Sequence, residues 1–470
     1  MEGLEVSEVS LTEIAEENYS FRIDSEFVMK EYLLNQKTIK NYSLGFSQLG
    51  ALSTEVTGGA TPLGAAYLNS GVMFLRVQNI MPNYFNLNDV VYISYKDDNS
   101  LSRSRLKLND VLLTITGVSY GKSAVVEQSL VGCNINQHSV RIKLKKGLNP
   151  YFLSTFLNSK HGKLQSDKNV VGVTRPALDY PSIRNFYVPN ISTLFQNKIE
   201  MLVKQAYQVQ DRSNTFYQKA ETMLLAELGI KDWHPVTETV EVKSFADSFG
   251  TSERLDSEFY QPKFRELEDK LRATKKDVTL GSVLTFCQRG TQPIYVEERG
   301  TIVLNSKHVR ENKIQFTDNR IASLAETRPD LIIRKGDVLM NGTGVGTIGR
   351  AAAYLSDNNA LPDNHVTILR SKTIDPVFLA LQLNSIVGKL QVEKYYKGSS
   401  GQIELYPDDI KQFMIWQAPD ETQKKVRETI ESAQEQSKQS KQLLGIAQRA
   451  IELAIETSEN EAQIWLDKQI

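Results

Sequence analysis

The chain has 470 residues, which is too long for one ordinary hydrophobic core and indicates two domains with some extended structure. Hydrophobic residues make up 40% of the chain and charged residues 24%, and no run of about 18 apolar residues could span a bilayer. This composition excludes a membrane-embedded protein, and the net charge of −1 argues against binding to nucleic acid through overall charge alone.

The charge is unevenly distributed along the chain. Residues 1–35 contain nine acidic and two basic residues, whereas Lys96 to Lys146 contain nine basic and four acidic ones. A basic patch in a neutral chain suits a protein that binds DNA with help from partners, although solvated charged faces would give the same counts. The N-terminus lacks the layout of a secretory signal, and Cys133 and Cys287 lack metal-site spacing, so we expect a cytoplasmic protein.

Short elements of both kinds are expected in the first half of the chain. The apolar runs Val90–Ile93 and Val111–Ile115 predict strands. Pro150–Leu157 is predicted as a short helix that begins at Asn149, because Asn caps helices and Pro fits their first turn. The pattern favours mixed α and β structure.

A long helix is predicted after the segment Val188-Pro189. Apolar and small residues follow one another there in steps of four and three, which is typical of a heptad seam. The seam consists of Phe195, Ile199, Leu202, Ala206, Val209, Ser213, Phe216, Ala220 and Met223. At about 1.5 Å per residue this helix spans ~40 Å, which is close to one turn of DNA.

The second half of the chain repeats motifs of the first in the same order. The offset between the copies changes only from 232 to 226 residues, which indicates a duplication with small loop changes. The matched pairs are Arg22–Phe27 with Arg254–Phe259, Asp110-Val-Leu with Asp337-Val-Leu, Thr116-Gly-Val with Thr343-Gly-Val, His138 with His365, Leu157-Asn-Ser with Leu383-Asn-Ser, Gly162-Lys-Leu-Gln with Gly388-Lys-Leu-Gln, Gly172 with Gly398, and Tyr180-Pro with Tyr406-Pro.

A second heptad seam follows Ala418-Pro419. It consists of Val426, Ile430, Ala433, Ser437, Ser440, Leu444, Ala447, Ile451 and Ala454. Each helix could instead pack only on its own domain, but two seams of equal length at equivalent positions favour an antiparallel coiled coil.

The predicted fold class is therefore α+β, with two tandem mixed α/β domains related by a pseudo-twofold duplication, each followed by a long helix. The expected boundaries are 1–189 for the first domain, including the acidic segment 1–35, 190–230 for the first helix, 231–253 for a linker, 254–419 for the second domain, and 420–470 for the second helix and tail.

Taken together and in this order, these motifs resemble the specificity subunits of type I restriction-modification systems. The resemblance covers about residues 20 to 457 and depends on the glycine loop after Asp-Val-Leu, on Asn136–His138 and Asp363–His365, on the Asn-Pro or Asp-Pro helix start, and on Gly-Lys-Leu-Gln. No motif is specific alone, but their order occurs twice, with a heptad helix after each copy.

The resemblance implies that each domain recognises one part of a split double-stranded DNA target. It also implies that the helices set the gap between the parts and dock two methyltransferase subunits, to which two restriction or motor subunits can add. The chain itself would then be non-catalytic and hold no cofactor, with S-adenosylmethionine, ATP and Mg²⁺ in the partner subunits.

Direct readout of bases favours Arg, Lys, Asn and Gln on rigid backbone, and glycines let a loop approach phosphate. In the first half the candidate DNA-binding residues are Arg76, Gln78, Asn79, Thr116, Gly117, Tyr120, Lys122, Asn136, Gln137, His138 and Arg175. In the second half they are Lys307, His308, Arg310, Thr343, Gly344, Gly346, Arg350, Asn364, His365 and Gln402. Asn136 to His138 and their counterparts could instead form a buried hydrogen-bond network. Arg175 and Gln402 differ between the halves and are candidates for base choice.

Other chemistry is disfavoured. Gly344-Val-Gly346-Thr-Ile-Gly349 matches the dinucleotide fingerprint, but the stretch after it is too short for the required helix. Asn149-Pro-Tyr-Phe resembles the amino-methyltransferase tetrapeptide but has one Pro where that motif needs two. We expect no metal site and no ATP-binding loop. The alternative functions are a coiled-coil scaffold that does not bind DNA and, less favoured, a nucleotide-dependent enzyme.

Overall fold

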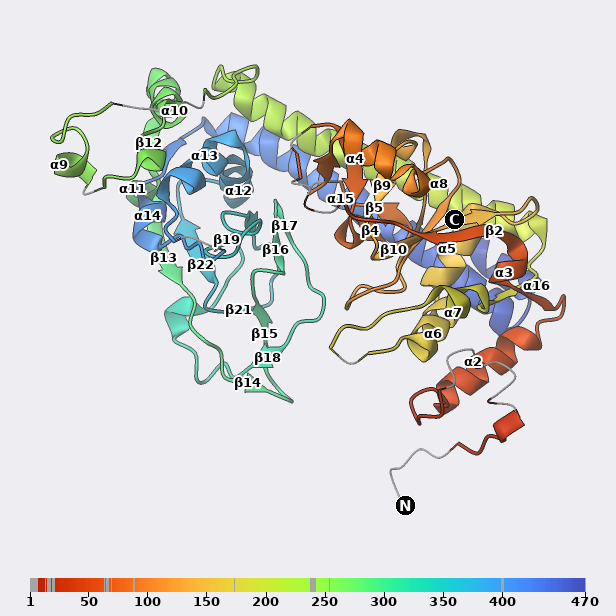
Figure 1. Ribbon diagram of the computed structural model, residues 1–470. Coiled ribbons are helices and arrows are strands. Elements are labelled where there is room, and N and C mark those ends of the chain that lie inside the picture. The colour runs from red at the N-terminus through yellow and green to blue at the C-terminus, as the bar shows by residue number, and fades with distance from the viewer. Residues whose placement is uncertain are drawn as a thin grey trace. The chain divides into compact units, whose positions relative to one another are not determined.

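The computed structural model describes residues 7–12, 14, 18, 22–62, 64, 67–68, 70–87, 89–172, 174–236, 242–252, 254–398 and 401–469. The predicted acidic segment 1–35 and linker 231–253 lie partly outside these described residues. The chain forms two compact units, one of Met1–Gln210 with Lys438–Ile470 and the other of Asp211–Ser437. Both contain sheets and helices, which confirms the mixed α/β fold (Figure 1). The sequence-based boundaries end each domain before its long helix, whereas each compact unit includes part of both long helices.

The first unit contains a four-stranded antiparallel sheet. Its order is β2 (Ser53–Gly58), β10 (Ser139–Leu144), β7 (Val111–Thr114) and β8 (Ser123–Val125). The smaller sheets are β6 (Val91–Ile93) with β3 (Val72–Leu75) and β9 (Asn134–Ile135), β1 (Phe46–Gln48) with β11 (Tyr187–Pro189), and β4 (Ile80–Met81) with β5 (Tyr84–Phe85). The strands predicted at 90–93 and 111–115 are confirmed within a residue.

The first unit also contains several shorter helices. They are α2 (Lys30–Lys40), α3 (Leu49–Leu52), α4 (Tyr95–Ser100), α5 (Pro150–Asn158), α6 (Lys160–Asn169) and α7 (Tyr180–Arg184). Helix α5 confirms the predicted helix start, because the Asn149 side chain accepts hydrogen bonds from the amides of Tyr151 and Phe152. Its Phe152 and Phe156 are fully buried in the core of the unit.

The second unit repeats the order of the four-stranded sheet, whereas its counterpart of the three-stranded sheet has four strands. Its four-stranded sheet has the order β13 (Leu284–Arg289), β22 (Val366–Ser371), β19 (Val338–Asn341) and β20 (Ala351–Ala353). The smaller sheets are β14 (Tyr295–Val296), β18 (Ile321–Ala322), β15 (Thr301–Leu304) and β21 (Leu361–Pro362), then β12 (Asp277–Thr279) with β23 (Met414–Trp416), and β16 (Val309–Arg310) with β17 (Lys313–Ile314). Its helices are α9 (Phe249–Ser252), α10 (Pro262–Ala273), α11 (Leu280–Val283), α12 (Pro376–Asn384), α13 (Ile386–Tyr395) and α14 (Pro407–Lys411).

Several of the repeated motifs have structural roles that are the same in both units. Ser159 and Ser385 cap α6 and α13. A Cβ on Gly162 or Gly388 would lie 2.3 or 2.0 Å from a carbonyl oxygen of the preceding helix, so the close approach requires glycine. Gln165 and Gln391 each pair through the side-chain amide with the backbone of β11 and β23 respectively. These residues therefore hold the framework of each unit together.

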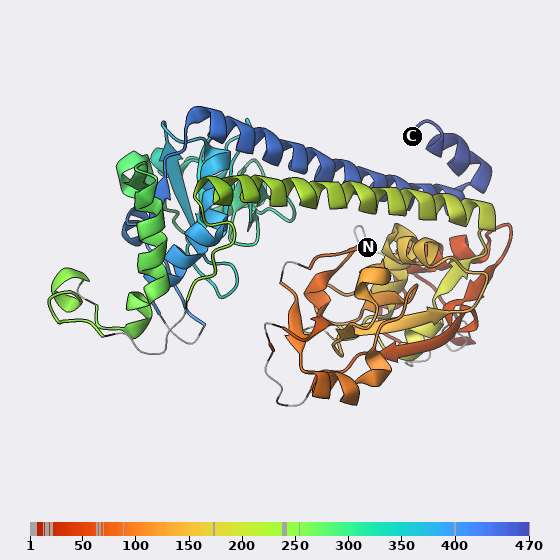
Figure 2. The same cartoon turned by 90° about the horizontal axis from the view of Figure 1, so that it is seen from above.

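The predicted long helices are α8 (Thr193–Glu227) and α15 (Asp420–Glu456), and α16 (Glu459–Leu466) follows α15. In each unit a length of α8 lies beside a length of α15 (Figures 1 and 2). In the first unit the Ser440 hydroxyl donates a 2.8 Å hydrogen bond to the carbonyl of Ala206. In the second unit the Ser213 hydroxyl donates a 2.7 Å bond to the carbonyl of Ala433. Among the described residues, no helix has the length and apolar character needed to cross a membrane.

Candidate nucleic-acid interface

Three segments that the sequence analysis selected meet at one corner of the first unit, where β7 ends and β10 begins. The Gly117 amide donates to the carbonyl of Pro176 at 2.9 Å, which joins the glycine loop to the segment that carries Arg175. The Ile115 amide donates to the carbonyl of His138, also at 2.9 Å. The glycine loop, His138 and Arg175 therefore form one cluster.

The polar side chains of this cluster contact each other. A guanidinium nitrogen of Arg175 lies 3.0 Å from Nε2 of His138, and Arg175 is exposed while His138 is half-buried. Burial, and secondly the charge of Arg175, lower the pKa of His138. A neutral imidazole can accept this hydrogen bond at Nε2, so His138 holds the guanidinium in an accessible position.

The second unit has an equivalent cluster between β19 and β22. The Thr343 hydroxyl oxygen lies 2.9 Å from Nδ1 of His365, and the Gly342 amide donates to the carbonyl of His365 at 2.8 Å. Backbone bridges join Thr116 to Ala177 and Thr343 to Glu404. Because Arg175 and Gln402 each lie two residues before these bridges, they occupy equivalent positions, as the repeat indicated.

Arg289 and Glu404 belong to this second cluster but were missed by sequence reasoning. Arg289 Nε donates to the carbonyl of Asn364 at 2.6 Å, and its Nη2 lies 3.5 Å from the Glu404 carboxylate. Hydrogen bonds from Tyr406 and then Arg289 lower the pKa of Glu404, so this carboxylate stays ionised. One sequence signal could have identified Arg289. It ends strand β13, whereas the equivalent strand β2 ends in Gly58, so this position carries a charged side chain in the second repeat only.

The candidate residues Arg76, Gln78 and Asn79 directly follow strand β3, which is linked by backbone hydrogen bonds to the cluster of the first unit. The Asn136 amide donates to the carbonyl of Leu75, and in the second unit the Asp363 amide donates to the carbonyl of Leu304. Arg76 follows Leu75, is half-buried, and donates to the carbonyl of Asp89 at 2.6 Å while lying over the Tyr67 ring. The Arg76–Asn79 segment is thus tied to the same corner.

Three candidate residues are buried, and their contacts are structural. Asn79 accepts a 2.8 Å bond from the Arg76 amide and donates to the carbonyl of Asn86 at 2.9 Å. His308 is held between the Asn305 amide and the carbonyl of Thr317, at 3.0 and 3.1 Å. Asn136 accepts from the amide of His138. These side chains shape the loops, and little of their surface is available to a base.

The remaining candidates reach the surface to different degrees. Exposed are Gln78, Gln137, Arg175, Lys307, Arg310, Gly346, Asn364 and Gln402, and half-buried are Thr116, Gly117, Tyr120, Lys122, Thr343, Gly344 and Arg350. Gly117 and Gly344 have φ values of +76° and +92°, which L side chains rarely adopt. The Tyr120 hydroxyl donates to the Asp167 carboxylate at 2.7 Å, and burial lowers the pKa of Lys122.

The basic patch between Lys96 and Lys146 is only partly accessible to a ligand. Arg105 pairs with Asp98, and the buried Arg141 pairs with Glu55 at 2.8 Å and lies 3.8 Å from Asp110. The exposed cations are Lys96, Arg103, Lys107, Lys143, Lys145 and Lys146. The count from sequence therefore overstates the charge that this patch offers.

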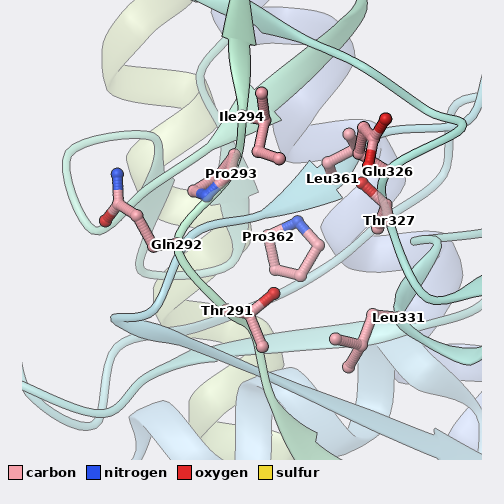
Figure 3. A pocket seen from close by; sticks show the side chains of 9 residues that line it. All are labelled: Thr291, Gln292, Pro293, Ile294, Glu326, Thr327, Leu331, Leu361 and Pro362. Atoms are coloured by element: carbon pink, nitrogen blue, oxygen red, sulfur yellow. The ribbon is translucent and has the colours of Figure 1, made fainter.

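The structure offers little for other kinds of chemistry. The loop Gly344–Gly349 is followed by strand β20, where the dinucleotide fold has a helix. A shallow hollow of about 270 Å³, which includes open solvent, is lined by nine residues of the second unit around Pro362 (Figure 3). Glu326 is the titratable residue among them, so the hollow holds no pair of acid and base. Within the described ranges no group of three or more His, Cys, Asp or Glu could hold a metal ion.

Comparisons with known proteins give one match in sequence and several in structure. Over 148 residues the chain is 30% identical to the specificity subunit of the type I restriction enzyme EcoBI from Escherichia coli. The match covers 31% of this chain and 30% of that protein, so the chain aligns with less than a third of the relative's length. No family model matches the chain.

Two similar crystal structures are of S subunits. The type I restriction-modification S subunit from M. genitalium has a TM-score of 0.38 and 12% identity, covering 88% of this chain and 96% of its own. The HsdS subunit from Thermoanaerobacter tengcongensis has a TM-score of 0.28 and 14% identity, with coverage of 88% and 96%. In sequence, the similarity to a specificity subunit of a type I restriction enzyme is limited to the 148 aligned residues.

Proposed function

We propose that the chain recognises a bipartite double-stranded DNA target as the specificity subunit of a type I restriction-modification complex. The observation that carries the proposal is the pair of equivalent clusters. Both have the same backbone frame, formed by the glycine loop, the start of β10 or β22, and the segment bridged to Thr116 or Thr343. The side chains on that frame differ, with Arg175 in one unit and Gln402, Arg289 and Glu404 in the other.

A shared backbone frame with different side chains suits two domains that recognise different DNA sequences. Arg and Gln make paired hydrogen bonds to guanine and adenine edges respectively, and a carboxylate accepts from the amino group of cytosine. Two modules that each recognise a short sequence multiply their selectivities when they bind one duplex together. We assign base contacts to Arg175, Arg289, Gln402 and Glu404, and phosphate contacts to the glycine loops and Lys122.

We assign the long helices the role of an antiparallel spacer between the two half-sites. The two serine-to-carbonyl hydrogen bonds support this role. One heptad forward along α8, from Ala206 to Ser213, corresponds to one heptad back along α15, from Ser440 to Ala433. The helices would also dock two methyltransferase subunits, to which two motor-nuclease subunits can add. Methylation, ATP-driven translocation and cleavage, with S-adenosylmethionine, ATP and Mg²⁺, would belong to those partners.

The experiment is DNA binding by the full chain, measured by fluorescence anisotropy over a range of salt concentrations. The duplex carries the bipartite sequence mapped by long-read detection of modified bases in cells with and without this gene. The test variant replaces the exposed Lys143, Lys145 and Lys146 with Glu, and the control replaces the exposed Lys231, Lys275 and Lys335 with Glu.

The test variant is expected to bind more weakly and to have a flatter salt dependence, by about 0.9 in slope for each phosphate that the protein no longer neutralises. The control is expected to retain the slope of the wild-type chain. If the wild-type chain binds the mapped duplex no better than a scrambled one, the proposal is wrong. If, in addition, the chain still assembles with partner subunits, the scaffold alternative is favoured.

A further inference from the structure

The repeated segment Arg22–Phe27, with its second copy Arg254–Phe259, lies outside both candidate clusters. It is nevertheless the most similar stretch shared by the two halves, with sequences Arg-Ile-Asp-Ser-Glu-Phe and Arg-Leu-Asp-Ser-Glu-Phe. The contacts of its Arg, Asp and Phe residues indicate what it does.

In the first unit Arg22 joins this segment to the end of α6. Its guanidinium donates two hydrogen bonds to the Asp24 carboxylate, at 2.8 and 2.7 Å. Its Nη1 donates to the carbonyl of Lys168 at 3.0 Å and to that of Val170 at 2.8 Å. Carbonyls in the last turn of a helix have no partner inside the helix, so Arg22 satisfies that of Lys168, and that of the C-cap residue Val170, with a charged donor.

Phe27 completes the contact. It is buried, and two cations lie near its ring, with Arg22 Cζ 5.4 Å and Lys168 Nζ 4.5 Å from the ring centre. The Phe27 amide donates to the Asp24 carboxylate at 3.1 Å, so the Arg22–Asp24 pair and the ring are fixed to one another.

The second unit repeats the arrangement on α13. Arg254 pairs with Asp256 through two nitrogens and donates to the carbonyl of Lys394 at 3.4 Å. Arg254 Cζ and Lys394 Nζ lie 4.5 and 5.0 Å from the centre of the Phe259 ring. The second copy keeps the Arg–Asp pair, a bond to a carbonyl at the helix end and a Phe ring beside two cations, although Phe259 is only half-buried and Arg254 bonds one such carbonyl where Arg22 bonds two. The shared contacts indicate the same role in each unit.

The chain that leaves each clamped helix end enters the candidate interface. After Val170, the amides and carbonyls of Val171 and Ala177 pair at 2.8 and 2.9 Å, and Arg175 lies between them. After Tyr395, Lys397 and Glu404 pair in the same way at 2.8 Å, and Gln402 lies between them. In the first unit the clamp bonds the carbonyl next to Val171, the first paired residue, and in the second unit it bonds the helix end three residues before Lys397.

We propose that Arg22–Asp24 and Arg254–Asp256 are positioning residues, which hold the paired residues Val171 and Ala177, and Lys397 and Glu404, and with them Arg175 and Gln402, in the geometry needed to recognise DNA. Each clamp acts on its own unit, so it affects one half-site and leaves the other unchanged. The DNA part of this inference rests on the proposed function, whereas the clamp itself can be tested without DNA.

The first test is hydrogen exchange of the full chain, followed by mass spectrometry on peptides that cover 168–178 and 394–405. Arg22→Gln is expected to speed exchange of the Val171 and Ala177 amides about tenfold, the effect of losing a charge-assisted hydrogen bond, and to leave 394–405 unchanged. Arg254→Gln is expected to do the reverse. The exposed Arg212→Gln is the matched control and should change neither peptide.

If Arg22→Gln does not fold, Arg22→Lys replaces it, because Lys keeps the charge but lacks the planar fork that bonds Asp24 and the carbonyls together. Unchanged exchange in both peptides, or equal acceleration in both, overturns the clamp. The first result means that the segment does not depend on Arg22, and the second means that the variant loosens the whole fold.

The second test measures binding to duplexes in which one mapped half-site at a time is scrambled. Arg22→Gln is expected to remove most of the discrimination, about tenfold, at one half-site and to leave discrimination at the other intact, with Arg254→Gln giving the opposite result. Equal losses at both half-sites, or no loss despite faster exchange, overturn the positioning role. If the wild-type chain shows no discrimination at all, the proposed function fails, and the exchange experiment still decides whether the clamp exists.

Discussion

Inserting one heptad into each long helix tests whether the helices measure the distance between the half-sites. The insertions are placed after Gln210 in α8 and after Ser437 in α15, where the chain passes from one compact unit to the other. This placement keeps the hydrogen bonds that tie the helices to their units, including those of Gln434 with the carbonyl of Asn312 and of Lys313 with Ser437. Each insertion repeats the preceding heptad, so both seams keep their period.

The expected change follows from helix geometry. Seven residues lengthen an α-helix by about 10 Å, and DNA rises about 3.4 Å per base pair, so the preferred spacer should grow by about three base pairs. A heptad turns the seam by only about 20°, whereas three base pairs turn the duplex by about a third of a turn. The lengthened chain should therefore bind its new optimum more weakly than the wild-type chain binds its own.

The assay is selection from duplexes in which the two mapped half-sites are separated by spacers of every length from zero to about 15 base pairs. Sequencing of the bound fraction gives the preferred spacer for each protein. A chain with only the α8 insertion is the control, and it should select poorly because the seams no longer match. An unchanged spacer preference in the double insertion would refute the measuring role, and altered half-sites would refute the division of labour between helices and modules.

Three further predictions concern single residues. Arg175→Ala should lower the discrimination between correct and substituted bases at one half-site and Arg289→Ala at the other, each by about 1–3 kcal/mol. The measurement is fluorescence anisotropy with base-substituted duplexes. If both variants lose discrimination at the same half-site, the pairing of clusters with half-sites is wrong. Asp375→Ala should lower the free energy of unfolding by about 1–2 kcal/mol in denaturant titrations, because Asp375 caps α12 and pairs with Arg427. The control is Asp408→Ala at an exposed position, which should lower the free energy of unfolding by less than about 0.5 kcal/mol. Burial lowers the pKa of His161 and of His308, so the unfolded chain takes up protons more readily than the folded one, and the free energy of unfolding should fall as the pH drops below about 6.5. His161→Gln should make the free energy of unfolding, measured in denaturant titrations, depend less steeply on pH. An unchanged dependence would contradict this account.

The sequence predicted the framework well because local chemistry determines it. Asn149 and Asp375 precede a proline, and in both places the structure has a capped helix at that position. The heptad steps predicted two long helices, and most of the seam residues are buried, since a repeated apolar stripe has to be covered. Helix caps and heptad patterns depend on residues that are close together in the sequence, so one sequence is enough to predict them.

The candidate site could be predicted only in part. The glycine loop, His138 and Arg175 were selected separately, and their meeting depends on β7 pairing with β10, which sequence spacing does not reveal. Asn79 and His308 have side chains that suit base contacts, but their partners are backbone groups that only the fold brings near. Arg289 was missed because its contacts with Asn364 and Glu404 come from chain segments 75 and 115 residues away.

Some residues recur in both halves and others differ between them, and this contrast suggests why a duplicated chain suits recognition of a split DNA target. Gly162 recurs in both halves because a side chain there would clash with a backbone carbonyl, and Gln165 and the Arg22 clamp recur because they bond backbone groups. A change at any of these positions would cost stability in either unit. Arg175 and Gln402 lie on frames built by those residues, and they are exposed, so a substitution there costs the fold little. Under the proposed function, each half-site can therefore change by substitution at the exposed positions of one unit, while the other unit and the helices between them stay as they are.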